Sequence, residues 1–136
     1  MRAHRGRPGP TVLLAGDGAD LGDLEALIAT LPADAYGQVY VEVGAADEVR
    51  PLPTPRRVHV TWLVRGADAA PGTLLCSAVE AWTAEWMPDG HRDDRRIAWV
   101  GCASAPRIAA RYRRLQERSM SAAAMGLPVV DVDGAE

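Results

Sequence analysis

Apolar residues in this chain gather in short runs, separated by stretches in which apolar positions recur every three or four residues. Short runs rich in β-branched and aliphatic residues, closed by glycine, proline or polar residues, are typical of strands buried in a sheet. Five such runs predict strands at Thr11–Gly16, Val39–Val43, Val58–Val64, Ile97–Gly101 and Val129–Val132.

The stretches between these runs predict helices. Asp20 is a suitable N-cap for a first helix that Pro32 ends, Thr73 can cap a second, and Ser104 with Pro106 opens a third. The positions expected to be buried are Leu21, Leu24, Ile28 and Leu31 in the first helix, Leu75, Val79, Trp82 and Trp86 in the second, and Ile108, Tyr112 and Leu115 in the third.

Strands that alternate with helices pair in parallel through right-handed crossovers. The pattern therefore predicts an α/β fold, a Rossmann-like three-layer sandwich with a mostly parallel five-stranded sheet. Residues 1–10 are rich in Arg, Gly and Pro and are expected to form a flexible N-terminal tail. The remaining residues, 11–136, are expected to form a single domain, because a chain of 136 residues has room for one core.

The charges are unevenly distributed, although the formal net charge is only -3. The segment Thr11–Glu48 holds acids and no base, and all the basic residues of the chain are arginines. The absence of lysine excludes Schiff-base chemistry and a phosphate-loop ammonium. Net acidity argues against general nucleic-acid binding, so the arginines at 107, 111, 114 and 118 are interpreted as a solvated or partner-facing surface.

Several other classes of protein are not indicated. The two cysteines, Cys76 and Cys102, are too few for a disulfide scaffold, and the three histidines lack ligand spacing, so no metal site is expected. The apolar run Val12–Ala15 is too short for a signal peptide, and no run is long enough for a membrane span. We expect a cytoplasmic protein.

Candidate binding residues follow the first and fourth predicted strands. In open parallel sheets, ligands bind at the carboxyl ends of strands where the strand order reverses. This rule selects Gly16, Asp17 and Gly18, together with Gly101, Cys102, Ala103 and Ser104. The glycines allow phosphates to approach the backbone, whereas the acids at 17, 20 and 23 are equally well explained as helix-capping residues.

Two further positions have two interpretations each. Glu42 lies near the end of the second strand, where a dinucleotide domain places an acid on the ribose hydroxyls. The arginines that could instead meet a 2′-phosphate are Arg50, Arg56, Arg57 and Arg65. The second interpretation of Glu42 and of Arg65 is a solvated surface charge. Cys102 is either a reactive thiol at a helix N-terminus or a small residue packed beside a strand end.

Several stretches of the chain resemble the C-terminal domain of siderophore-interacting, FAD-dependent ferric reductases. They include LLAGDGADLGDLEALIATLPADAYGQVYVEV, VHVTWLVRG, PGTLLCSAVEAW and AWVGCASAPRIAARYRRLQ, and they span about Thr11 to Arg118 in matching order. Cys102 departs from the family, which usually has Glu there.

The resemblance implies an NAD(P)H-binding domain of the ferredoxin-reductase-like superfamily, which passes a hydride to a flavin held by another domain. It places Gly16, Asp17 and Gly18 beside the pyrophosphate, and Gly101 to Ser104 near the nicotinamide. We expect weak binding of NADPH or NADH, no FAD on this chain, and a flavoprotein or other protein partner or a homodimer. The alternative is a non-redox descendant, either an accessory protein or a domain adapted to another small molecule. Catalytic residues are not identified.

Overall fold

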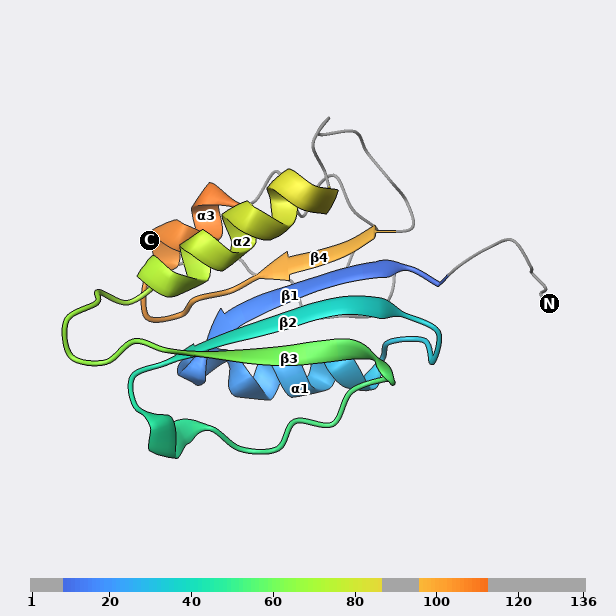
Figure 1. Ribbon diagram of the computed structural model, residues 1–136, viewed down its shortest axis with the longest axis horizontal. Coiled ribbons are helices and arrows are strands. Elements are labelled where there is room, and N and C mark those ends of the chain that lie inside the picture. The colour runs from blue at the N-terminus through green and yellow to red at the C-terminus, as the bar shows by residue number, and fades with distance from the viewer. Residues whose placement is uncertain (1–8, 87–95, 113–136) are drawn as a thin grey trace.

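A parallel four-stranded sheet forms the centre of the protein (Figure 1). The computed structural model describes residues 9–86 and 96–112. Within them the strand order is β3-β2-β1-β4, with β1 at Thr11–Asp17, β2 at Tyr36–Val43, β3 at Arg57–Val64 and β4 at Arg96–Val100. Because β1 pairs with both β2 and β4, successive units of the chain are wound onto opposite sides of β1.

Helices cover both faces of the sheet (Figure 1). Helix α1, Leu21–Ala29, packs on one face, and α2, Thr73–Trp86, and α3, Pro106–Arg111, pack on the other. Short 3-10 helices at Gly18–Asp20 and Ala46–Glu48 follow the ends of β1 and β2. The three layers confirm the predicted Rossmann-like α/β class.

The core consists of two layers that β1 separates. Its alternate residues face opposite sides: Val12 and Leu14 pack with α1, whereas Leu13 and Ala15 pack with α2. All four are fully buried, which explains why β1 is apolar throughout rather than alternating. Of the second predicted helical stripe, Leu75, Val79 and Trp82 are buried as expected.

The observed elements differ from the predicted ones in four places. The described residues contain four strands instead of five, and the fifth predicted strand, 129–132, lies outside them. Strand β2 begins three residues earlier than expected, because Gly37 adopts a φ of +148° and lies against the backbone of Val12, a close approach that a Cβ would prevent. The β1–β2 ladder reaches Pro10, whose carbonyl accepts the N–H of Tyr36, so Pro10, which was expected to belong to the tail, pairs with the sheet.

The fourth difference concerns Asp20. It occupies the N-cap position of α1, as predicted, but its side chain makes no capping bond to that helix. The side chain points instead toward the loop after β4, which is part of the candidate functional site.

Candidate functional site

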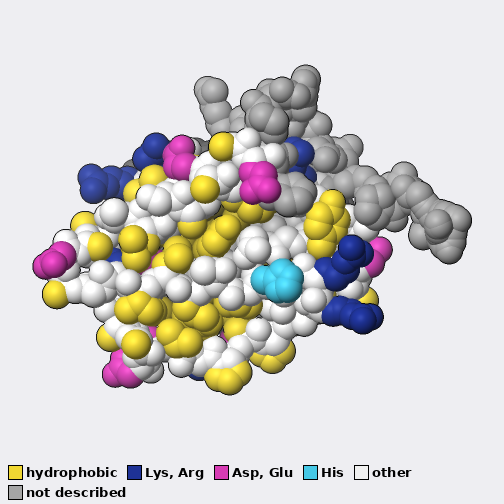
Figure 2. All heavy atoms as spheres, viewed as in Figure 1, with side chains coloured by type: hydrophobic (Ala, Val, Ile, Leu, Met, Phe, Trp, Pro, Cys, Tyr) yellow, Lys and Arg dark blue, Asp and Glu magenta, His cyan; other side chains and the backbone are white. Residues whose placement is uncertain are grey.

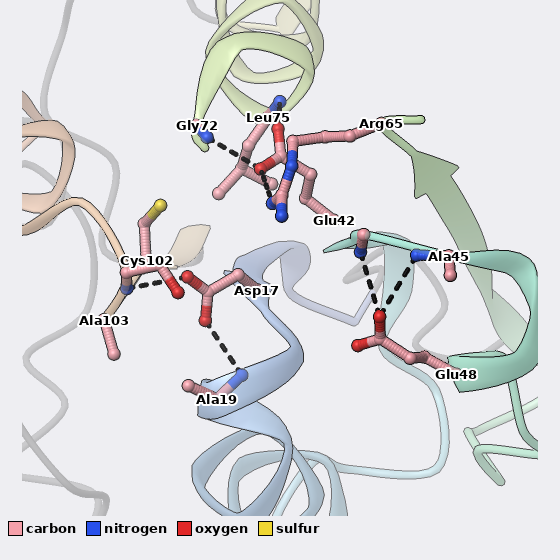
Figure 3. A network of polar contacts seen from close by, with 12 residues as sticks. Asp17, Ala19, Glu42, Ala45, Glu48, Arg65, Gly72, Leu75, Cys102 and Ala103 are labelled. Atoms are coloured by element: carbon pink, nitrogen blue, oxygen red, sulfur yellow. Dashed lines mark hydrogen bonds and ion pairs between the residues drawn. The ribbon is translucent and has the colours of Figure 1, made fainter. Parts of the chain in front are cut away.

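The ends of β1 and β4 lie side by side, so the two predicted ligand-binding segments meet. The N–H of Gly101 donates to the carbonyl of Ala15 at 2.8 Å, which extends the β1–β4 pairing to the last residue before the loop. Figure 3 shows Asp17 between Ala19 and the loop that holds Cys102 and Ala103. This juxtaposition is the crevice at the reversal of strand order that the sequence pattern predicts.

The backbone donors of the loop after β4 bind carboxylates of the protein itself. The N–H groups of Cys102 and Ala103 donate to Oδ2 of Asp20 at 2.6 and 3.1 Å, and the N–H of Ser104 donates to Oδ2 of Asp17 at 2.8 Å. Three consecutive N–H groups that converge on oxyanions form an anion-binding concavity. In this protein, two aspartates supply the oxyanions.

The same two aspartates also fix the turn after β1. Asp17 accepts the N–H of Ala19 through Oδ1 at 3.0 Å, and Asp20 accepts the N–H of Asp17 through Oδ2 at 2.9 Å. Five backbone N–H groups therefore compensate two nearly buried carboxylates, which are 1% and 7% exposed. The positions of Asp17 and Asp20 just before the first helix predicted that they cap it. The sequence did not reveal that both side chains also join the end of β1 to the loop after β4.

The two carboxyl groups differ in acidity. Burial raises the pKa of Asp20, and the neighbouring Asp17 charge adds to the rise, against the lowering effect of its N–H bonds. Burial also acts to raise the pKa of Asp17, but hydrogen bonds from Ser104, Asp20 and Ala19 outweigh it and the pKa falls below its usual value. Asp17 is therefore the more strongly ionised member of the pair.

Glu42 forms a second buried network beside the first. Its side chain is fully buried at the end of β2, where Oε1 accepts from Arg65 Nη1 at 2.9 Å and from the N–H of Gly72 at 2.7 Å, and Oε2 accepts the N–H of Leu75 at 3.0 Å. Figure 3 shows these contacts converging on one carboxylate. Glu42 thus joins β2, the end of β3 and the start of α2, and it is not the surface charge of the second interpretation.

The other arginines considered for a 2′-phosphate lie elsewhere. Arg50 forms an ion pair with Glu25 of α1 at 2.9 Å, and Arg56 and Arg57 lie at the start of β3, the opposite end of the sheet. Of these arginines, Arg65 is the one that lies beside Glu42 at the carboxyl end.

A residue that sequence reasoning missed is Glu48, whose Oε2 accepts the N–H groups of Gly44 and Ala45.

Cys102 agrees with the packing interpretation. The side chain is fully buried, and burial raises the pKa of its thiol to about 12, with further contributions from Asp17, Glu42 and Asp20. Its φ of +88° lies in the left-handed region, a conformation that non-glycine residues rarely adopt. The reactive-thiol interpretation considered only the helix N-terminus. It did not include the negative charges that surround the sulfur.

The glycines of the site are in different surroundings. A Cβ on Gly16 would lie 2.9 Å from Asp20 Cβ, and one on Gly101 would lie 2.6 Å from the Trp99 ring, so both positions need glycine for internal packing. At Gly18 the nearest atom is the end of a flexible side chain, Glu48 Oε1, at 3.1 Å. Of these three glycines, Gly18 is the one at which a flexible side chain, that of Glu48, would have to move for a ligand to approach.

Comparison with known proteins identifies the family. A family model described as siderophore-interacting protein matches residues 10–127, most of the chain. The chain belongs to the siderophore-interacting protein family. This result agrees with the resemblance drawn from the sequence.

Solved structures of family members share the fold. A siderophore utilization protein from T. fusca is 30% identical, with a TM-score of 0.57, and the match covers 82% of this chain and 40% of that one. The siderophore-interacting protein SipS from Aeromonas hydrophila also has a TM-score of 0.57, at 24% identity, over 83% of this chain and 49% of its own.

Curated relatives align over a shorter region. Uncharacterized proteins from Mycobacterium bovis and Mycobacterium tuberculosis are 39% identical to this family member over 82 residues. That region is 56% of this chain and 29% of theirs. The aligned part thus spans less than a third of these relatives.

Across residues 9–86 and 96–112, no helix is both long enough and apolar enough to cross a membrane.

Proposed function

We propose that this chain is the NAD(P)H-binding module of a ferric-siderophore reductase system, working with a flavin that a different domain or protein holds. The observation that carries the proposal is the meeting of the β1 and β4 ends at the reversal of strand order, in a member of the siderophore-interacting protein family. Bound NAD(P)H would supply a hydride to the flavin, which then reduces the ferric siderophore one electron at a time.

The charges at the crevice are compatible with a pyrophosphate. Two bare carboxylates would repel it, but those of Asp17 and Asp20 are compensated by five backbone N–H groups. Close approach at Gly18 requires the flexible Glu48 side chain to move aside, and Arg65, 19% exposed, is the nearby cation. The proposed cofactor-binding residues are Gly16, Asp17, Gly18, Glu42, Arg65, Gly101, Cys102, Ala103 and Ser104. Since the donors of the β4 loop are already engaged, we expect weak binding of NADPH or NADH.

The proposed module needs a flavin within contact distance to complete hydride transfer. We therefore propose a cytoplasmic flavoprotein partner or domain, with self-association of this chain into a homodimer as the alternative. Catalytic residues on this chain are not assigned.

Titration calorimetry with NADPH and NADH tests the cofactor proposal. We expect saturable heats, and loss of them in Gly18→Phe, whose ring fills the space beside β1. Gly22→Phe is the matched control, because a Cβ on Gly22 meets nothing within 4 Å and the site is on the exposed start of α1. Absence of heat up to millimolar cofactor, or equal binding by both variants, contradicts the proposal.

A second candidate function, a non-redox descendant, has one specific observation in its favour. The carboxylates of Asp17 and Asp20 occupy the N–H groups of Cys102, Ala103 and Ser104, which would otherwise be available to a phosphate. A protein with this closed arrangement would bind an uncharged small molecule or a partner at the crevice. Ligand screening by crystal soaking, with an apolar ligand found at Gly101–Ser104 and no nucleotide affinity, would favour it.

A further inference from the structure

A hollow of about 480 Å³ opens at the amino ends of β2 and β3, on the sheet face that carries α2. Tyr36 and Arg57 begin these strands and pair in register, whereas Asp17 and Glu42 pair at the opposite end of the sheet. At about 3.3 Å per residue, the length of β2 places the hollow roughly 20 Å from the crevice. We call it the amino-end pocket; it is lined by Tyr36, Gly37, Gln38, Tyr40, Arg56, Arg57, His59, Ala81, Trp82 and Glu85.

The pocket has an excess of cationic groups. Arg56, Arg57 and His59 line it with exposed side chains, and among the described residues Glu85 of α2 is the one acid that lines it. Within the described part of the chain, neither arginine has an ion-pair partner. The guanidinium of Arg57 lies 5.9 Å from the centre of the Tyr36 ring, which holds it at the rim. Figure 2 shows basic side chains gathered beside the histidine at one end of this face.

Neutral hydrogen-bond donors line the floor. Burial and the charge of Glu85 raise the pKa of Tyr40, so its hydroxyl stays protonated and can donate. Gln38 accepts the hydroxyl of Thr61 at 3.4 Å through Oε1, and among the described residues its amide nitrogen has no partner. Both donors belong to β2, and they line the same pocket as the guanidinium groups at the start of β3.

The remaining walls are aromatic and apolar. Tyr36 and Tyr40 line the hollow with half-buried rings, and Trp82, which is nearly buried, and Ala81 add small apolar surfaces. The volume falls within the range of about 300–1,000 Å³ that is usual for small-molecule sites. Planar rings stack on aromatic side chains, and the planar guanidinium group matches the two oxygens of a carboxylate or the oxygens of a phosphate.

We propose that the amino-end pocket binds a small molecule with a planar aromatic ring and a carboxylate or phosphate group. The oxyanion would lie at Arg56 and Arg57, and the ring would lie against Tyr36 and Tyr40, whose side chains are half-buried. The site is independent of the crevice between β1 and β4, because the two lie at opposite ends of the strands.

Binding of 2-naphthoate, followed by ¹H–¹⁵N NMR on the full chain, tests this proposal. We expect saturable shifts of the amides of Tyr36, Gln38, Tyr40 and His59, and at least tenfold weaker binding of 2-naphthamide, which has the same ring without the charge. Inorganic phosphate and phenyl phosphate, measured in parallel, report whether the anion alone suffices. Equal affinity for naphthoate and naphthamide, or shifts confined to Gly16–Asp20, overturns the proposal.

Two variants with a matched control locate the anion. Arg57→Gln and Arg56→Gln should each weaken naphthoate at least fivefold, with an unchanged thermal midpoint because both side chains are exposed. Arg50→Gln removes the same charge outside the pocket and should leave binding unchanged. Retention of full affinity in the Arg56→Gln/Arg57→Gln double variant overturns the assignment. The double variant should bind NADPH as the parent chain does, so failure of this proposal and of the cofactor proposal are distinguishable.

Discussion

One carboxylate oxygen of Asp20 accepts three backbone N–H groups, that of Asp17 at the end of β1 and those of Cys102 and Ala103 in the loop after β4. Two of these bonds cross more than eighty positions of sequence, so a single side chain holds the turn after β1 against the loop after β4. Hydrogen bonds to a charged acceptor are among the stronger ones in proteins, and a buried donor left without a partner is costly.

Replacing Asp20 tests this role at the residue scale. Asp20→Ala leaves three N–H groups without their acceptor and should lower the free energy of unfolding by about 2–4 kcal/mol. Asp20→Asn keeps an acceptor oxygen in nearly the same place and should lose less than half as much. Urea unfolding followed by tryptophan fluorescence measures both. Equal losses in the two variants would show that the acceptor oxygen is unimportant.

The two cysteines should differ in reactivity. Cys102 is fully buried and its pKa is raised to about 12, so almost no thiolate is present at neutral pH. Cys76 is partly exposed on α2. Brief treatment of the native protein with iodoacetamide, followed by peptide mass analysis, should label Cys76 and leave Cys102 unmodified, whereas both should be labelled in urea. Faster labelling of Cys102 would restore the reactive-thiol interpretation.

At the scale of elements, Glu42 is the point where β2, β3 and α2 are joined. The carboxylate accepts N–H groups of Gly72 and Leu75 at the start of α2, where a helix leaves backbone donors without internal partners. Glu42, a residue of β2, thus caps the start of α2, a role that the sequence pattern assigned to Thr73. The ion pair with Arg65 adds a charge partner, 19% exposed, to a fully buried acid.

Removing Glu42 should lower the free energy of unfolding more than removing Arg65. Glu42→Ala leaves two helix donors and a mostly buried guanidinium without an acceptor, and should cost about 3–5 kcal/mol. Arg65→Ala should cost less than half of that, because Glu42 keeps both backbone donors. Chemical denaturation of the two variants and of the double variant measures the coupling. Equal costs for the single variants would mean that the ion pair, rather than the helix start, carries the stabilisation.

At the scale of the whole molecule, charge is polarised along the strands. The acids Asp17, Asp20 and Glu42 lie at the carboxyl end of the sheet, whereas Arg56 and Arg57 lie at the amino end. Along the chain, the acids and the arginines already lie in different segments. The parallel pairing of the strands places these segments' charges at opposite ends of one sheet. The acids at the crevice are nearly buried and bind backbone N–H groups, whereas the arginines of the amino-end pocket are exposed.

Global stability should depend on the ionisation of the two aspartates with opposite signs. The pKa of Asp17 is lowered on folding, so its contribution is present above about pH 3.8, the unfolded value, and is lost as the pH falls through the lower folded value. The pKa of Asp20 is raised, so the folded state binds the proton more tightly, and this group lowers stability as the pH rises from 3.8 through the folded value.

The free energy of unfolding measured in urea between pH 2.5 and 7 separates the two contributions. Asp17→Asn should flatten the loss of stability below pH 3.8. Asp20→Asn should remove the decline just above that pH, so that its stability relative to the parent chain improves as the pH rises. An unchanged pH profile in both variants would contradict the assigned shifts.

Much of the architecture was predictable because it depends on local patterns. The apolar run of β1 and the helical spacing of Leu75, Val79 and Trp82 reflect burial, which a periodic pattern records directly. The start of β2 was not predictable, since Gly37 disfavours a strand by itself and is there because the backbone of Val12 approaches it. Likewise, the segments that form the crevice followed from the topology, but the partners of their polar groups did not.

The sequence by itself determined the family, the α/β class and the two segments that meet at the end of β1, because these depend on composition, order and spacing along the chain. Only the tertiary structure decided that Asp17 and Asp20 hold the loop of Cys102, that Glu42 begins α2, and that Arg56 and Arg57 border a separate pocket. These contacts join residues 23 to 87 positions apart or place neighbouring strands side by side. Their energy depends on distances that local spacing does not encode.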